Sequence, residues 1–113
     1  MQGINKVSLI GNIGKEPEIN VLEGNIKVAK FSLATTETYK DTSGTKQTHT
    51  EWHSIVAWRG LADLAEKYLH KGSSLYIEGK LRTRNFDSKE GHKVYVTEIL
   101  AETIIMLDKA NKE

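Results

Sequence analysis

One helical segment stands among strand-like segments in this 113-residue chain, and its position constrains the fold more than any other feature. Apolar residues in positions 60–72 recur three and four residues apart, which is the spacing of an amphipathic helix. Gly72 suits the left-handed residue that often follows a helix, and cations gather just before it, where the helix dipole favours them. The predicted buried stripe consists of Leu61, Leu64, Ala65, Tyr68 and Leu69.

Three segments before the helix and two after it have the two-residue period of β-strands. Ala29, Phe31 and Leu33 alternate with polar residues, and further along Leu75, Ile77 and Leu81 share one predicted face. Apolar residues change parity within the last segment, which predicts a bend or bulge there. The predicted strands cover residues 4–13, 26–38, 48–58, 74–86 and 94–106. Turns are predicted at residues 16–17 and 23–25, and hairpin loops at 39–47 and 87–92.

Five strands with a helix between the third and the fourth match the OB-fold, a partly open five-stranded Greek-key barrel. The sequence therefore predicts an all-β fold with one helix. Its length suits a single domain, which we assign to residues 1–107, followed by a short polar tail at residues 108–113. OB-folds commonly bind oligonucleotides or oligosaccharides, but the fold alone does not decide the function.

The stretch T-H-T-E-W-H offers two incompatible chemistries. On a helix, His49 and His53 would share a face and could hold a metal ion. The stretch is rich in strand-forming residues, and on a strand the two histidines stand about 13 Å apart, too far for one ion. We therefore predict a strand and no metal. The same strand places Trp52 and Trp58 together on its opposite face.

Nothing in the sequence has the pattern of a catalytic centre. There is no serine–histidine–acid signature, no phosphate-binding loop and no dinucleotide fingerprint, and cysteine is absent. We predict a protein that is not an enzyme and uses no cofactor, although an OB-fold nuclease remains an alternative. The start of the chain lacks a signal-peptide pattern and no apolar run reaches membrane-spanning length, so we expect no membrane association.

Aromatic residues interleaved with basic and hydroxyl residues favour nucleic-acid binding. An aromatic ring stacks on any base, and nearby arginine or lysine neutralises phosphates. The net charge of +1 argues weakly against such binding, but bases concentrate locally in K-L-R-T-R, residues 80–84. A tryptophan in a small barrel is more often part of the core, and the R-T-R face could be a solvated edge. Together, however, the four aromatic positions favour nucleic acid.

Several motifs resemble those of bacterial single-stranded DNA-binding proteins. They are N-K-V-S-L-I-G-N (5–12), F-S-L-A-T (31–35), T-E-W-H (50–53), Y-L-H-K-G (68–72) and Y-I-E-G-K-L-R-T-R (76–84). The resemblance implies a cytoplasmic, nucleoid-associated homotetramer without a cofactor. It would bind single-stranded DNA with little sequence preference and protect it in replication, recombination and repair. The resemblance implies stacking by Tyr39, Trp52, Trp58 and Phe86, phosphate contacts by Lys6, Lys40, Lys71, Arg82 and Arg84, and subunit contacts by His53.

The sequence also departs from this family pattern. Arg59 stands where a glycine is usual, and Gly60 stands where many members have a lysine. Many members also continue into a flexible linker and an acidic tip that recruits replication and repair proteins, and residues up to 113 contain neither. An alternative is therefore a primosome-type OB module whose main task is protein interaction.

Overall fold

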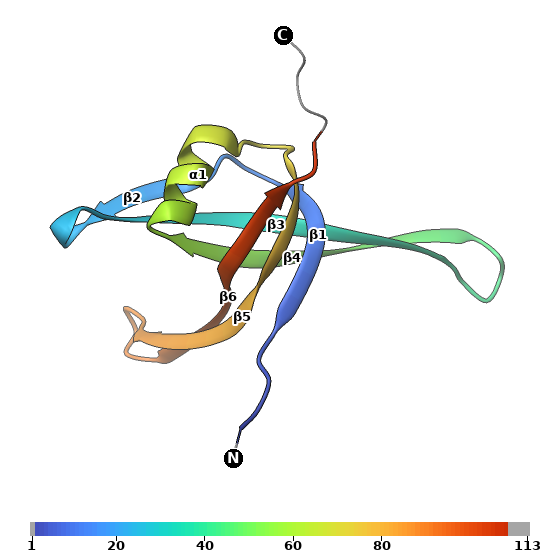
Figure 1. The fold of residues 1–113 in the computed structure, drawn as a ribbon. Coiled ribbons are helices and arrows are strands. Elements are labelled where there is room, and N and C mark those ends of the chain that lie inside the picture. The colour runs from blue at the N-terminus through green and yellow to red at the C-terminus, as the bar shows by residue number, and fades with distance from the viewer. Residues whose placement is uncertain (1, 109–113) are drawn as a thin grey trace, which may run out of the picture.

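The computed structural model describes residues 2–108, and it contains all five predicted strands and the predicted helix (Figure 1). A sixth, short strand lies between the first and second predicted strands. The elements are β1 (Val7–Ile13), β2 (Glu18–Leu22), β3 (Ile26–Lys40), β4 (Lys46–Trp58), α1 (Gly60–Tyr68), β5 (Ser74–Asp87) and β6 (Lys93–Met106).

β1 closes the sheet into a barrel because it pairs with two strands. The sheet runs β1-β5-β6-β4-β3-β2, and β1 also pairs with β3. Asn12 marks the change of partner, since it lies opposite both Ser74 and Ala34. Gly11 precedes it at a close crossing, where any Cβ would collide with the Ala34 carbonyl. The result is a closed five-stranded barrel with the OB-fold order, which confirms the predicted fold.

β2 was not predicted from the sequence, which indicated only turns on either side of it. This strand extends the sheet beyond the barrel by pairing with β3, from Glu18 opposite Lys30 to Leu22 opposite Ile26. Most of its side chains are exposed, so it lacks the buried face that makes longer strands recognisable. The turn predicted at residues 23–25 is confirmed, and both Gly24 and Asn25 have positive φ there.

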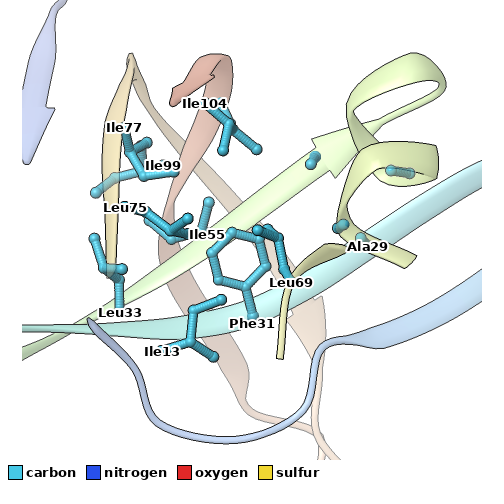
Figure 2. Close-up of a cluster of buried hydrophobic side chains, with 14 residues drawn as sticks. Ile13, Ala29, Phe31, Leu33, Ile55, Leu69, Leu75, Ile77, Ile99 and Ile104 are labelled. Carbon is cyan, nitrogen blue, oxygen red and sulfur yellow. The ribbon is translucent and has the colours of Figure 1, made fainter. Parts of the chain in front are cut away.

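Alternating residues from β3, β4, β5 and β6 fill the barrel (Figure 2). Leu33, Ile55, Leu75 and Ile77 are the largest side chains that are almost completely buried. Their alternation confirms the inward faces predicted for β3 and β5. Leu81 is an exception, because it lies half exposed where β5 extends past the barrel.

The parity change in the last strand comes from a β-bulge. Glu78 lies opposite Thr103 and Gly79 lies opposite Ala101, so Glu102 is an extra residue in β6. Ala101 before the bulge and Ile104 after it are both buried. The inserted residue therefore lets both halves of β6 face the core, which confirms the predicted irregularity.

α1 is shorter than predicted and packs against β3, β4 and β6. The helix ends at Tyr68, because Leu69 is already extended, so Gly72 (φ +92°) belongs to the turn before β5 and does not cap the helix. The predicted stripe was partly wrong: Ala62, Ala65 and Leu69 are buried, whereas Tyr68 is mainly exposed. Small alanines let the helix lie close to the sheet.

The β3–β4 hairpin projects far from the barrel (Figure 1). Its strands reach Lys40 and Lys46, so the loop is shorter than the predicted residues 39–47. The Asp41 carboxylate orders this loop by accepting hydrogen bonds from the backbone N–H groups of Ser43 and Thr45, each at 3.0 Å. Of the predicted tail, only Asp108 is described, and residues 109–113 lie outside the described residues.

Candidate nucleic-acid interface

Both tryptophans of β4 point away from the core. Trp52 is 60% exposed and Trp58 is 39% exposed, whereas the alternate residues Ile55 and Ala57 are buried. The interpretation of these indoles as core residues is therefore wrong. Because this segment is a strand, the paired-histidine metal site is also wrong, and no cluster of three or more metal-binding side chains exists among residues 2–108.

Three adjoining hollows, which we call the groove because each shares lining residues with the next, lie over the outer face of β3 and β4. The first, about 330 Å³, has Trp58, Arg82 and Arg84 in its walls. The second, about 250 Å³, shares Lys30, Val56 and Glu98 with the first. The third, about 320 Å³, shares Lys15 and Ser32 with the second and ends at Gly14 and Trp52. The groove thus leads from one indole to the other.

Gly14 supports the indole at one end of this groove. A Cβ built on Gly14 would lie 2.5 Å from Cζ3 and 2.7 Å from Cη2 of Trp52. The six-membered ring therefore lies directly against the glycine backbone, and any Cβ at this position would force the ring to move. This contact fixes the ring on one side and leaves the remainder of the indole open to solvent.

The groove carries cations beside carboxylates. Lys15, Lys30 and Arg82 are exposed and make no ion pair within the described part of the chain. Arg84 forms two hydrogen bonds to Glu98, from Nε to Oε1 at 3.1 Å and from Nη2 to Oε2 at 3.0 Å. These bonds raise the pKa of the Arg84 guanidinium. Three unpaired cations therefore remain for an anionic ligand.

The other two predicted aromatics occupy different positions. Phe86 is 45% exposed and lies on the same face of β5 as Arg82 and Arg84, so it continues the line of the groove toward the β5–β6 loop. Tyr39 is 53% exposed but pairs with Gln47 in an unbroken ladder, which places it on the opposite face of the β3–β4 hairpin from Trp52. Of the four rings, Trp52 and Trp58 line the groove, and Phe86 lies beside it on the face of β5 that carries Arg82 and Arg84.

The three predicted lysines do not line the groove. Lys6 forms an ion pair with Glu78 at 2.6 Å on the outer face of β1 and β5, and this contact raises the pKa of the lysine. Lys40 lies at the end of β3, beside the hairpin loop. Lys71 lies in the turn after α1, where its backbone N–H donates to Glu16, a residue of the second hollow.

His53 lies on the face of β4 opposite Trp52. Its Nε2 is 2.9 Å from the Thr35 hydroxyl, and the side chain is half-buried. Its predicted role in subunit contacts stays a prediction, since only one chain is present.

Sequence reasoning missed several residues of the groove. Lys30 and Ser32 could have been found, because they alternate with the buried residues of β3 and so had to face outward. Lys15 and Gly14 lie in the β1–β2 connection and gave no periodic signal. Glu98 could be recognised as a groove residue only from its hydrogen bonds to Arg84 across β5 and β6.

The structure shows backbone strain at one departure from the expected pattern. Arg59 precedes α1 with φ +56° and ψ −116°, a conformation that glycine adopts more easily than arginine. The backbone N–H of Arg59 donates to the Lys27 carbonyl at 2.8 Å, and the Arg59 carbonyl accepts a hydrogen bond from the backbone N–H of Asp63. These two hydrogen bonds fix the backbone of Arg59. Arg59 and Gly60 border a fourth hollow, about 470 Å³, that shares Val21 with the groove.

Among residues 2–108, no helix has both the length and the apolar character needed to cross a membrane. Fold and groove together define the class of the molecule: a closed OB-fold barrel with an open outer groove of aromatic and cationic side chains. A model of the Single-strand binding protein family matches residues 4–107. The chain therefore belongs to the single-strand binding protein family.

Similar proteins agree with this assignment. Single-stranded DNA-binding protein 1 of Xylella fastidiosa (strain 9a5c) is 46% identical over 96% of this chain and 81% of its own length. Single-stranded DNA-binding protein 1 of Chlorobaculum tepidum is 50% identical over 94% of this chain but only 66% of its own length. The Plasmodium falciparum SSB complex with ssDNA matches with a TM-score of 0.88 and 38% identity, covering 96% of this chain and 98% of that one.

Proposed function

We propose that this chain binds single-stranded DNA with little sequence preference and protects it in replication, recombination and repair. The observation that carries the proposal is the series of three adjoining hollows from Trp58 to Trp52, in which both indoles are open to solvent. Bases stack on aromatic faces whatever their sequence, and cations beside the rings neutralise phosphates. Relatives named for single-stranded DNA binding support the same function.

In this proposal the groove residues differ in their roles. Trp52, Trp58 and Phe86 stack bases, and Arg82 contacts phosphates together with the lysines of the groove. Tyr39, Lys6, Lys40 and Lys71 would meet DNA only if the strand leaves the groove and passes around the barrel or the β3–β4 hairpin. The binding function requires no catalytic group and no cofactor, and we place it in the bacterial cytoplasm at the nucleoid.

We further propose that the chain forms a homotetramer. Ile10, Tyr76 and Ile105 are successive partners across β1, β5 and β6 on the outer face of the barrel. Ile10 and Ile105 are exposed, and an apolar row of this kind is typical of a surface that another copy covers. In this proposal His53, which lies on β4, would contribute a contact between subunits outside this apolar row. Mass measurement in solution tests the subunit number, with Tyr76→Arg as the variant expected to give smaller assemblies.

The central experiment is a titration of tryptophan fluorescence with oligo-dT at several salt concentrations. Stacking should quench both indoles, and Trp52→Ala should weaken binding by about 1–3 kcal/mol without loss of the fold. Three unpaired cations per groove predict a slope of log K against log[salt] of about −2 per subunit, from about 0.7 per neutralised phosphate. Absence of quenching and of binding would instead favour the protein-interaction module.

A further inference from the structure

The ion pair between Arg84 and Glu98 is the most unusual feature of the groove. Glu98 lines both the first and the second hollow, so a carboxylate lies in the middle of the proposed DNA path. A free carboxylate there would repel phosphates. Its side chain is only 13% exposed, however, and both oxygens accept hydrogen bonds from Arg84, whose own side chain is 46% exposed.

Resting on the proposed function, we propose that Arg84 acts on DNA as a flat stacking surface held in place by Glu98, and not as a phosphate contact. Glu98 is thereby a positioning residue. It does not need to touch DNA, because its effect is to fix the plane and cancel the charge of the guanidinium.

The geometry of the pair supports a fixed plane. A guanidinium has five N–H donors in one plane, and here Nε and Nη2 each donate to a different oxygen of the same carboxylate. Such a bidentate bond removes rotation about the end of a long side chain. The exposed guanidinium face then resembles an aromatic platform, since bases stack on arginine planes as they do on rings.

The charges of the pair argue against a phosphate contact. A phosphate that approaches Arg84 also approaches the Glu98 carboxylate a few ångströms away, so attraction and repulsion largely cancel. Arg82 provides the contrast: it lies directly opposite Glu98 in the strand register, yet Glu98 bonds the diagonal neighbour Arg84. Arg82 therefore keeps a full charge for phosphates.

Position in the groove favours stacking as well. Arg84 and Trp58 line the same hollow, and Phe86 is the next residue on the same face of β5. Alternate residues of a strand lie about 6.6–7 Å apart, which suits successive bases of an extended single strand. Arg84 and Phe86 are thus neighbouring flat groups on β5, and Arg84 shares its hollow with the Trp58 indole.

The salt dependence of oligo-dT binding separates the two roles. We compare the wild type, Arg82→Met, Arg84→Lys and the double variant Arg84→Met/Glu98→Gln, which removes both charges and leaves no unpaired carboxylate. Arg82→Met should reduce the slope of log K against log[salt] by about 0.7. The double variant should keep the wild-type slope but bind about 5- to 100-fold more weakly at every salt concentration.

Arg84→Lys keeps the charge and the partner but loses the plane, so it should also bind more weakly with an unchanged slope. Circular dichroism and melting temperature test whether each variant folds. If the double variant does not fold, Arg84→Lys decides the test. The inference would be overturned if the double variant showed a salt slope reduced by about 0.7. It would also be overturned if either the double variant or Arg84→Lys bound oligo-dT with wild-type affinity. A wild type that binds no oligo-dT would overturn the proposed function with it.

Discussion

The contact between Gly14 and Trp52 makes a single methyl group a sharp test of the groove. In Gly14→Ala the new Cβ would lie 2.5 Å from Trp52 Cζ3, whereas ordinary contacts begin at 3.4 Å. The indole must therefore recede by about 0.9 Å, the difference between these two distances. Because the ring is mainly exposed, it can move without disturbing the core, and the φ of Gly14 is not one that demands glycine.

The size of the effect follows from the displacement. A base held in register by the rest of the groove then meets a displaced ring, and a misfit of about 0.5–1 Å forfeits a quarter to a half of a van der Waals contact. Since a stacked base contributes about 1–3 kcal/mol, Gly14→Ala should weaken oligo-dT binding by about 0.3–1.5 kcal/mol. That is about a 2- to 10-fold change in Kd, smaller than the change expected for Trp52→Ala.

Fluorescence titration with oligo-dT measures this change, and the chain offers a matched control. Gly60→Ala adds the same methyl group at a position where no atom outside its chain neighbours and its own helix backbone lies within 4 Å, so its affinity should equal that of the wild type. Thermal melting of both variants excludes a loss of fold. If Gly14→Ala bound as tightly as Gly60→Ala, the indole at this end of the groove would not be a stacking surface.

Three further predictions concern stability. Leu33→Ala should lower the free energy of unfolding by about 2–5 kcal/mol in a denaturant titration, because this side chain is completely buried, and a loss below about 1 kcal/mol would contradict its place in the core. Arg59→Gly should raise the melting temperature, since it relieves a positive φ that costs about 1–3 kcal/mol, and an unchanged or lower value would contradict that strain. Hydrogen bonds from Ser43 and Thr45 lower the pKa of Asp41 below its ordinary 3.8. The stability that the ionised Asp41 gives to the hairpin loop is therefore fully present above pH 3.8 and is lost as the pH falls through the lowered pKa. Amide exchange at Thr45 should therefore accelerate below about pH 4 in the wild type but show no such step in Asp41→Asn.

The barrel was predictable because its information is local. Alternation along β3 placed Ala29, Phe31 and Leu33 inside, and the parity change in the last strand indicated a bend or bulge, which the structure locates at Glu102. Each of these patterns needs only one strand and the two-residue period of its side chains. β2 escaped detection for the same reason, because an exposed edge strand has no buried face to reveal it.

The site was less predictable because it depends on pairs from distant strands. Periodicity placed Trp52 and Trp58 on a common face, which is correct, but did not decide whether that face was buried. It also could not show that Tyr39 lies on the opposite face of the hairpin, which follows from the register between β3 and β4. The pairing of Arg84 with Glu98 likewise requires the register of β5 and β6.

The charge balance of the chain is consistent with a groove that depends on stacking more than on phosphate contacts. The net charge is only +1, and the groove places Glu16, Glu18 and Glu98 among its cations. Counterion release alone would then give modest affinity that declines quickly with salt, whereas flat surfaces retain their contribution at any ionic strength. A neutral protein can therefore hold single-stranded DNA if exposed rings, and a guanidinium held flat by a carboxylate, supply the contacts that a strongly basic surface supplies elsewhere.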